Sequence, residues 1–217
     1  MNRPLLQVAL DQTKLEDALN VVKNVKDHVD IIEAGTILCL SEGSRSIGEI
    51  RKLVPDHIIA ADYKTADAGS TLAALAFDWG ADWFTVICGA PMATIEVAQE
   101  VAVEKGKEVQ IELFGNWTYD EAKEWVKMGV KQAIYHRGRD AQASGQTWGE
   151  KDLSALKQLS DIGLELSITG GLVPEELAVF KDVNAKAFIA GRALANMETG
   201  VATAQKFQNA ITEFWGE

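Results

Sequence analysis

Short hydrophobic runs, many of them rich in β-branched residues, alternate with longer amphipathic stretches along the whole chain. The runs are nearly continuous in apolar residues, which is typical of parallel β-strands covered on both faces. In several intervening stretches, hydrophobic positions repeat with a period of about 3.6, the period of one helix face. The predicted strands are Leu5–Leu10, Val29–Ala34, His57–Asp62, Trp83–Cys88, Val109–Phe114, Gln132–His136, Leu164–Thr169 and Ala187–Ala190. The predicted helices are Lys14–Val25, Thr94–Lys105, Glu121–Met128 and Val201–Phe214.

This alternation predicts an α/β fold. Eight strands in a chain of 217 residues indicate a single (β/α)8 TIM barrel, with residues 1–217 forming one catalytic domain. The longest irregular connection, Arg137–Lys151, follows the sixth strand, and loops of that length are often functional. The alternative is an open doubly wound sheet, but no G-x-G-x-x-G motif follows the first strand.

The charge balance narrows the range of partners. With 21 Lys+Arg against 32 Asp+Glu, the net charge is −11, which argues against nucleic acid or an anionic membrane as partner. A small anionic substrate remains compatible, because a site can be locally positive. No apolar run reaches the ~18 residues of a membrane span, and no signal peptide is recognised, so we expect a cytoplasmic location. Cys39 and Cys88 form no metal-binding pattern and are expected to be buried thiols.

Polar residues stand at most of the predicted strand ends. Barrel enzymes carry their active sites at the carboxyl ends of the strands, so these side chains are expected to project into one mouth. They are Asp11, Glu33, Asp62, Glu112, His136 and Thr169. His28 and His57 precede their strands and are expected at the opposite face, as solvated or structural histidines.

The strongest local signal is the D-x-K-x-x-D arrangement of Asp62, Lys64 and Asp67 after the third strand. Residues two apart on an extended strand face the same side, so Asp62 and Lys64 can share one site. Charged groups that emerge from a buried strand are costly unless they are paired or functional. The alternative interpretation is an ion-pair network at a strand end.

Glu33 and Asp62 end neighbouring strands. Mg²⁺ is usually held by one or two carboxylates together with water and substrate, so this pair predicts a Mg²⁺ site. No thiol or cluster of imidazoles accompanies them, which makes zinc the less suitable metal. The alternative is an unrelated pair of surface acids.

Glycines follow the last two strands. Gly170 and Gly171 come after the seventh strand, and Gly191 and Arg192 after the eighth. Backbone amides of such loops form the usual phosphate site of a barrel, and arginine can add a bidentate contact. The alternative is a pair of plain glycine turns.

Several of these segments together carry a resemblance to a known family. The chain resembles the orotidine-phosphate-decarboxylase superfamily over essentially its whole length, and the D-x-K-x-x-D motif at the third strand is the mark of that superfamily. The orotidine enzyme itself uses no metal and has lysine at the position of Glu33, so the resemblance favours the Mg²⁺-dependent members. The supporting segments are Ala9–Asp11, Ile32–Thr36, Ala61–Gly69, Gln110–Leu113, Tyr135–Gln142 and Ile168–Gly171.

The resemblance implies roles for individual residues. Lys64 would stand beside the developing oxyanion, Asp67 from the partner subunit of a homodimer would hold Lys64, and His136 and Arg139 would supply a proton. Glu112 would orient the substrate or Lys64. Residues expected to bind substrate are Asp11, Thr36, Thr169, Gly170, Gly171, Gly191 and Arg192.

The implied activity is the decarboxylation of a β-keto acid through an enediolate. The branch that the segments resemble most converts 3-keto-L-gulonate 6-phosphate to L-xylulose 5-phosphate and CO₂ in L-ascorbate breakdown. A sibling activity stays open, the aldolase reaction of 3-hexulose-6-phosphate synthase with ribulose 5-phosphate and formaldehyde. A non-catalytic sugar-phosphate-binding protein would be expected to lose the acids and the lysine, all of which are present.

Overall fold

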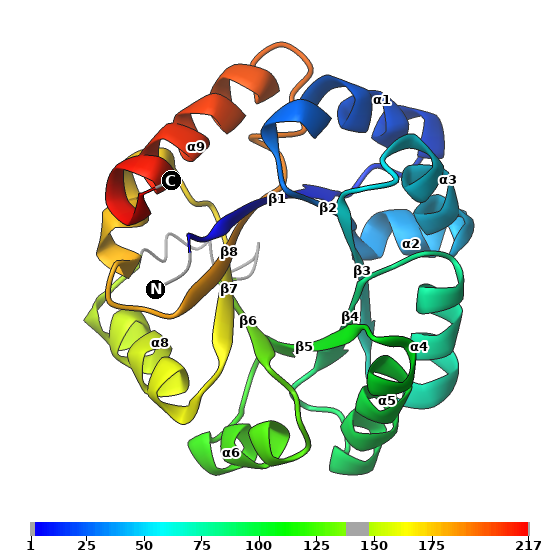
Figure 1. The fold of residues 1–217 in the computed structure, drawn as a ribbon, viewed down its shortest axis with the longest axis vertical. Helices are drawn as coiled ribbons and strands as arrows, with labels where there is room; N and C mark the ends of the chain where they lie inside the picture. The colour runs from blue at the N-terminus through cyan, green and yellow to red at the C-terminus, as the bar shows by residue number, and fades with distance from the viewer. Residues whose placement is uncertain (1–2, 138–147, 217) are drawn as a thin grey trace.

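Eight parallel strands close into a barrel surrounded by helices in the computed structural model, which describes residues 3–137 and 148–216 (Figure 1). Each strand pairs with the next along the chain, and β1 pairs with β8 to close the ring. The strands are β1 (Leu5–Leu10), β2 (Ile31–Ala34), β3 (Ile58–Thr65), β4 (Trp83–Ile87), β5 (Glu108–Leu113), β6 (Gln132–His136), β7 (Glu165–Thr169) and β8 (Ala185–Ala190).

The helices lie outside the strands and cover them on the outer face (Figure 1). The α-helices are α1 (Leu15–Val25), α2 (Thr36–Glu42), α3 (Arg45–Leu53), α4 (Gly69–Asp78), α5 (Met92–Lys105), α6 (Tyr119–Lys127), α8 (Glu150–Ile162) and α9 (Gly200–Trp215). Two 3₁₀ segments are η1 (Lys26–His28) and η2 (Pro174–Phe180). The predicted TIM barrel is therefore confirmed, and α1, α5, α6 and α9 correspond to the predicted helices.

Three element boundaries differ from the predicted ones for identifiable reasons. β3 continues to Thr65 because Lys64 is paired with acids, and a charged residue is then tolerated within the strand. β8 begins at Ala185 because Lys186, which interrupts the hydrophobic run, is paired with Glu165 at 2.8 Å. Helix α4 begins at Gly69, since Ala68 has a φ of 55°, a left-handed conformation that no α-helix includes.

Hydrophobic side chains on the outer faces of the strands pack against the helices and form the main core. Phe84, Phe188 and Phe207 are among its fully buried members. The lower part of the barrel interior is filled by a separate apolar cluster of Ile31, Ala60, Trp83 and Ala187. Alternate residues of a strand face opposite sides, so the next inward positions along β2, β3 and β4 are Glu33, Asp62 and Thr85. Polar groups therefore lie directly above this apolar cluster.

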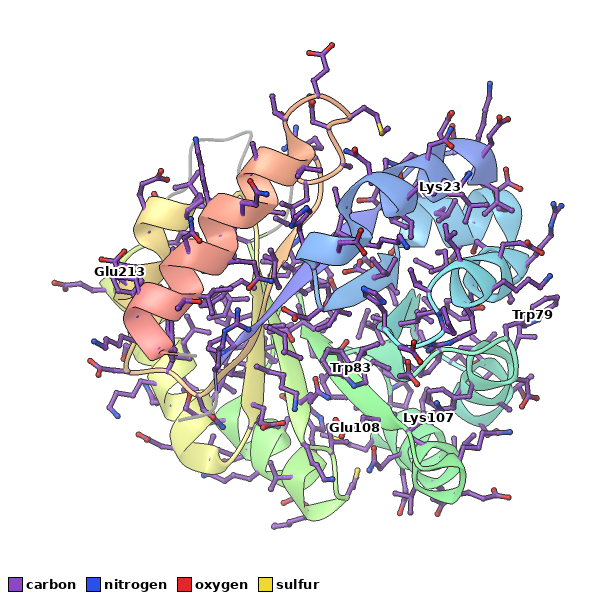
Figure 2. The ribbon with its side chains drawn as sticks, turned by 45° about the horizontal axis from the view of Figure 1, so that its top comes forward. Lys23, Trp79, Trp83, Lys107, Glu108 and Glu213 are labelled. Atoms are coloured by element: carbon purple, nitrogen blue, oxygen red, sulfur yellow. The ribbon has the colours of Figure 1, made fainter. Side chains whose placement is uncertain are left out.

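An ion-pair cluster joins the amino ends of the central strands. Asp82, directly before β4, accepts hydrogen bonds from Arg51 and from Lys107 Nζ at 2.6 Å, and from the backbone amide of Ile59 in β3. Figure 2 shows Lys107 beside Trp83 and Glu108 at the starts of β4 and β5. This end of the barrel is closed by structural contacts, so substrates must enter at the opposite end.

No helix within residues 3–137 and 148–216 has the combination of length and apolarity that a bilayer crossing requires.

Candidate active site

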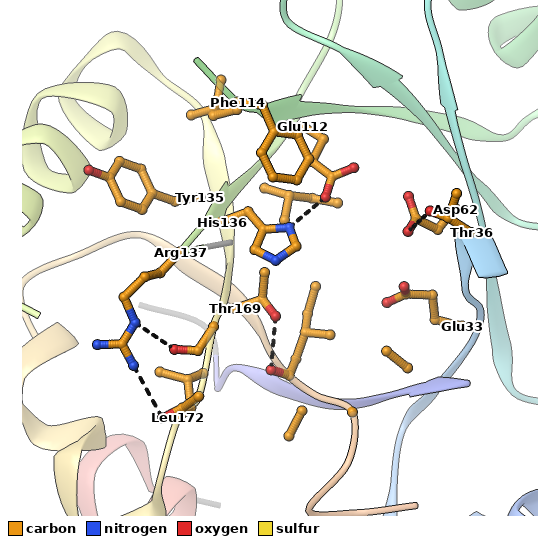
Figure 3. A pocket seen from close by; sticks show the side chains of 18 of the residues that line it. Glu33, Thr36, Asp62, Glu112, Phe114, Tyr135, His136, Arg137, Thr169 and Leu172 are labelled. Atoms are coloured by element: carbon orange, nitrogen blue, oxygen red, sulfur yellow. Dashed lines mark hydrogen bonds and ion pairs between the residues drawn. The ribbon is translucent and has the colours of Figure 1, made fainter. Parts of the chain in front are cut away.

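A cavity of about 1120 Å³ opens at the carboxyl ends of the strands. Figure 3 shows the Glu33 and Asp62 carboxylates across the cavity from His136, with Arg137 and Thr169 on the side of β6 and β7. The predicted site residues that line it are Asp11, Glu33, Thr36, Asp62, Lys64, Glu112, His136, Thr169, Gly170, Gly171, Gly191 and Arg192. The prediction of a single mouth is confirmed for these residues.

Two predicted residues are not part of this wall. Asp67 is exposed in the bend between β3 and α4, and it is not among the described residues that line the cavity of its own chain. Arg139 lies outside the residues that the structure describes, as does most of the long connection after β6. The predicted roles of Asp67 and Arg139 in catalysis stay predictions.

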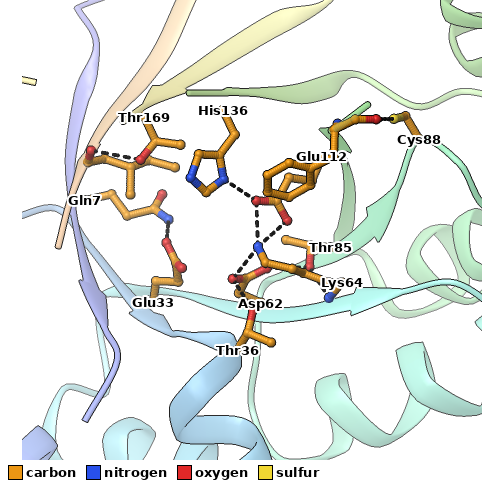
Figure 4. Close-up of polar contacts among 12 residues, drawn as sticks. Gln7, Glu33, Thr36, Asp62, Lys64, Thr85, Cys88, Glu112, His136 and Thr169 are labelled. Carbon is orange, nitrogen blue, oxygen red and sulfur yellow. Dashed lines mark hydrogen bonds and ion pairs between the residues drawn. The ribbon is translucent and has the colours of Figure 1, made fainter. Parts of the chain in front are cut away.

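Lys64 is the centre of a charged network (Figure 4). Its ammonium group lies 2.9 Å from Asp62 Oδ2 and 2.6 Å from Glu112 Oε2. Glu112 also accepts a hydrogen bond from His136 Nδ1 at 2.7 Å, and its side chain is almost fully buried. Burial opposes the charge of Lys64, but the carboxylates of Asp62 and Glu112 outweigh it and raise the pKa of the lysine. Lys64 is therefore a permanent cation at neutral pH, held between two strands and connected through Glu112 to an imidazole.

The backbone of β3 is irregular where these charges occur. Ala61 pairs with Phe84 and Thr65 with Val86, so three residues of β3 lie opposite one residue of β4. Lys64 has a φ of 47°, a left-handed conformation that is uncommon for a residue with a side chain. Bulges of this kind redirect side chains and are over-represented next to active sites. The bulge brings Lys64, from the end of β3, into the mouth.

Glu33 and Asp62 are both buried carboxylates with defined partners. Gln7 Nε2 donates to Glu33 Oε2 at 2.5 Å, and Thr36 Oγ1 donates to Asp62 Oδ2 at 2.7 Å. Burial, then the charge of Asp62, raises the pKa of Glu33 well above its usual range. Burial acts on Asp62 in the same direction, but the charge of Lys64 and hydrogen bonds from Thr36 and Lys64 lower its pKa overall.

This donor set suits a hard divalent cation. Two carboxylates can hold Mg²⁺ when water and substrate complete its ligands, and a cation here would relieve the repulsion between Glu33 and Asp62. Within the described residues, no group of three or more His, Cys, Asp or Glu side chains forms a closed metal cage. The residues present therefore fit an open magnesium site rather than a structural zinc site.

The glycine loops have the close packing that a phosphate site needs. Gly170 has a φ of 119°, and a Cβ there would lie 2.4 Å from the carbonyl oxygen of Arg137, so only glycine fits. Arg137 Nε donates to the Gly170 carbonyl at 2.9 Å, which fixes the loop from the side. After β8, the Gly191 carbonyl accepts from the amides of Leu194 and Ala195, which gives a helical turn at the rim.

An aromatic wall borders the network, and no pattern in the sequence pointed to it. The Phe114 ring lies 4.7 Å from the His136 ring, and Lys64 Nζ is 5.0 Å from the centre of the Phe114 ring. Phe114 only ends a hydrophobic run in the sequence, so its place beside two charged or titratable groups is visible in the structure alone.

The two cysteines differ in their burial. Cys88 is the buried thiol that was predicted, and its Sγ lies 3.0 Å from the Phe114 carbonyl oxygen. Cys39 is only partly buried, so the prediction for it was too strong. Its Sγ still donates to the Ala34 carbonyl at 3.3 Å, because α2 begins directly after β2 and folds its first turn back toward that strand. Neither thiol lines the cavity.

Comparison with known proteins agrees with this geometry. The sequence pattern of the Orotidine 5'-phosphate decarboxylase / HUMPS family matches residues 4–207. The chain is 59% identical over 216 residues to 3-keto-L-gulonate-6-phosphate decarboxylase SgbH of Escherichia coli (strain K12), covering 100% of this chain and 98% of that protein.

Solved structures give the same result. The crystal structure of 3-keto-L-gulonate-6-phosphate decarboxylase from Vibrio cholerae superposes with a TM-score of 0.94 at 49% identity, covering 99% of this chain and 100% of that one. The Streptococcus mutans KGPDC crystal structure, a complex with a sugar phosphate, has a TM-score of 0.96 at 43% identity, with 99% and 100% covered. A 3-hexulose-6-phosphate synthase structure is more distant, with a TM-score of 0.88 at 33% identity and 95% and 99% covered.

The raised pKa of Glu33 predicts that Glu33→Gln stabilises the metal-free protein as pH rises. Above the usual value of 4.5 and below the raised folded-state pKa, the folded chain keeps a proton on Glu33 that the unfolded chain has released. The free energy of unfolding therefore falls as pH increases through this window. Glutamine can still accept from Gln7 and carries no charge, so the variant escapes that loss.

Urea denaturation in a chelator, from about pH 5 to about pH 8, measures the effect. The advantage of Glu33→Gln over the unmodified protein is expected to grow with pH, whereas Glu16→Gln, at an exposed position on α1, should show no such trend. An advantage that is constant or shrinks with pH would contradict the assigned shift.

Proposed function

The chain belongs to the Orotidine 5'-phosphate decarboxylase / HUMPS family, and from this premise we propose that it converts 3-keto-L-gulonate 6-phosphate to L-xylulose 5-phosphate and CO₂. The observation that carries the proposal is the network of Asp62, Lys64, Glu112 and His136 in the cavity mouth. It supplies a fixed cation next to a group that can transfer a proton, which are the two needs of a decarboxylation followed by protonation.

The two sides of the cavity would bind different parts of the substrate. The phosphate is negatively charged and suits the amides of Gly170, Gly171 and Gly191 together with the exposed guanidinium of Arg192. The sugar chain then extends toward β1, β2 and β3, where Asp11 and Thr36 can bind hydroxyl groups. This orientation places the carboxyl end of the substrate near Lys64.

The reaction breaks the bond between the carboxyl carbon and its neighbour. The electron pair of that bond moves into the adjacent carbonyl group, which gives an enediolate and releases CO₂. Lys64 is charged at neutral pH and can donate a hydrogen bond to an enediolate oxygen, so it stabilises the charge as it develops. Because Asp62 and Glu112 already hold the ammonium group, little reorganisation is needed during the reaction.

The enediolate carbon must then receive a proton. His136 lies on β6 facing the cavity, and its Nδ1 is bonded to Glu112, which leaves Nε2 as the atom that can exchange a proton with substrate or water. A histidine suits this role because its usual pKa is near neutral. Arg139 is proposed to help on the strength of the family resemblance.

Glu33 and Asp62 are proposed to hold Mg²⁺. When bound, the ion would supply Lewis-acid stabilisation of the enediolate oxygens. The support is the chemistry of two buried carboxylates on neighbouring strands, together with the raised pKa of Glu33.

A homodimer with a shared site is also proposed. Asp67 is exposed and lies outside its own cavity wall, since it follows β3 across a bend and precedes α4. An isologous two-fold interface would bring Asp67 of the partner subunit toward Lys64 in each site. We place the protein in the cytoplasm, which agrees with two cysteines that are both free thiols.

Product analysis separates the proposed reaction from its sibling. Purified protein is expected to release CO₂ from 3-keto-L-gulonate 6-phosphate, and Lys64→Ala should reduce the rate by roughly a thousandfold or more, because it removes the main charge at the reacting atoms. Condensation of ribulose 5-phosphate with formaldehyde is measured in parallel. A dominant condensation rate would assign the chain to synthase activity, and sugar-phosphate binding without either reaction would make it a binding protein.

Metal removal is expected to abolish activity, and added Mg²⁺ or Mn²⁺ should restore it. Mg²⁺ should also raise the melting temperature of the unmodified protein, because a ligand that binds only the folded state stabilises it. Glu33→Gln should lose this thermal shift and the exposed-site control Glu16→Gln should keep it. Full activity after exhaustive chelation would contradict the metal site.

Mixed dimers test the shared site. Lys64→Ala and Asp67→Ala proteins should each be nearly inactive, but unfolding and reassembling them together forms dimers in which one site has both groups and the other has neither. Activity should then return to a fraction of the unmodified level, measured after subunit exchange has been demonstrated. Exchange without recovery would mean that Lys64 and Asp67 act within one chain.

A further inference from the structure

Thr85 lies in β4 directly beneath the charged network and has no established role. It is 1% exposed and is not among the described residues that line the cavity. Its hydroxyl donates to Asp62 Oδ1 at 3.0 Å and accepts from the backbone amide of Lys64 at 2.9 Å (Figure 4). One buried oxygen therefore contacts both residues of the D-x-K pair from the neighbouring strand.

The amide of Lys64 depends on this hydroxyl because the β-ladder is interrupted there. Thr85 is the single residue of β4 opposite Asp62, Tyr63 and Lys64, since the flanking pairs are Ala61 with Phe84 and Thr65 with Val86. A buried amide without a partner is costly, and the left-handed φ of Lys64 adds strain. The threonine hydroxyl replaces the missing ladder bond at this point.

The same hydroxyl also orients Asp62. Oδ2 of Asp62 accepts from Thr36 and Lys64, and Oδ1 accepts from Thr85 and, at 3.1 Å, from Lys64. Because donors from α2, β3 and β4 reach the two oxygens, the carboxylate plane has a single orientation. The side chain of Asp62 and the backbone from which Lys64 projects are thus held by one atom of Thr85.

We propose that Thr85 is a positioning residue for the decarboxylation, one that holds the β3 bulge so that Lys64 and Asp62 meet the substrate in register. The inference rests on the proposed function for its effect on turnover. Its structural part, the dependence of the Lys64 backbone on the Thr85 hydroxyl, stands independently of which reaction the site performs.

Only a hydroxyl can serve here, because the oxygen must donate to a carboxylate and accept from an amide at once. Thr85→Val keeps the shape of the side chain and removes both bonds. Thr85→Ser keeps the hydroxyl and removes a methyl group. The comparison therefore isolates the oxygen from the packing of the side chain.

Steady-state kinetics give the first readout. In Thr85→Val we expect kcat to fall by about 10- to 100-fold, the effect of losing a hydrogen bond to a charged group at a site that must be preorganised. KM should change by less than about threefold, since the phosphate-binding loops are distant in the chain and unaltered. Thr85→Ser should recover most of kcat.

Amide exchange gives a readout that needs no substrate. In protein labelled with ¹⁵N-lysine, the Lys64 amide should exchange slowly in the unmodified chain and in Thr85→Ser, and at least about tenfold faster in Thr85→Val. Thr36→Val is the matched control, because it removes the other hydroxyl bond to Asp62 without touching the Lys64 amide. Lys64 exchange should stay slow in that variant.

The outcomes are separable. If Thr85→Val does not fold, Thr85→Ser against Thr85→Ala gives a second pair that differs only in the hydroxyl. Fast exchange and low kcat in the variants without a hydroxyl, with recovery in Thr85→Ser, support the proposal. Unchanged exchange and kcat on removal of the hydroxyl, or no recovery in Thr85→Ser, overturn it. If the unmodified protein lacks decarboxylase activity, the proposed function fails, while the exchange measurements still decide the role of Thr85.

Discussion

The ion network of Lys64 with Asp62 and Glu112 is the interaction on which the rest of the site depends. Taking a lysine and two carboxylates out of water is costly, and only close pairing with additional hydrogen bonds offsets that cost. The structure supplies those bonds from neighbouring elements: Thr36 and Thr85 to Asp62, and His136 to Glu112. Removing one member would leave an uncompensated buried charge, so the network is expected to act as a unit.

The charges of this network do not cancel. Asp62 and Glu112 oppose one ammonium group, and Glu33 adds a third buried carboxylate whose pKa is raised by burial and by Asp62. The mouth near β2 and β3 is therefore short of positive charge and suited to a divalent cation. The phosphate-binding glycines and Arg192 lie at the other side of the cavity, after β7 and β8. Opposite preferences at the two sides give an extended sugar phosphate one favourable orientation.

The barrel separates stability from chemistry along its axis. The apolar cluster around Trp83 and the ion pairs of Asp82 close one end, and the strained Lys64 backbone lies at the other. Strain is tolerated at the mouth because the closed ring of strands and the helix-packed core hold the surrounding backbone. The same scaffold serves 3-hexulose-6-phosphate synthase, a relative at 33% identity, so the reaction is decided by side chains at the strand ends and not by the fold.

The sequence by itself determined the barrel, because strand and helix periodicities are local properties that can be counted along the chain. It also identified most of the cavity wall, from Asp11 to Arg192, since all strands of a barrel end at the same face. Thr85 and Phe114 could not be found in this way. Their importance comes from register: the bulge sets Thr85 against Lys64, and the closing of the ring brings Phe114 beside His136. Contacts across strands depend on which residues become neighbours in space, and only the tertiary structure decides that.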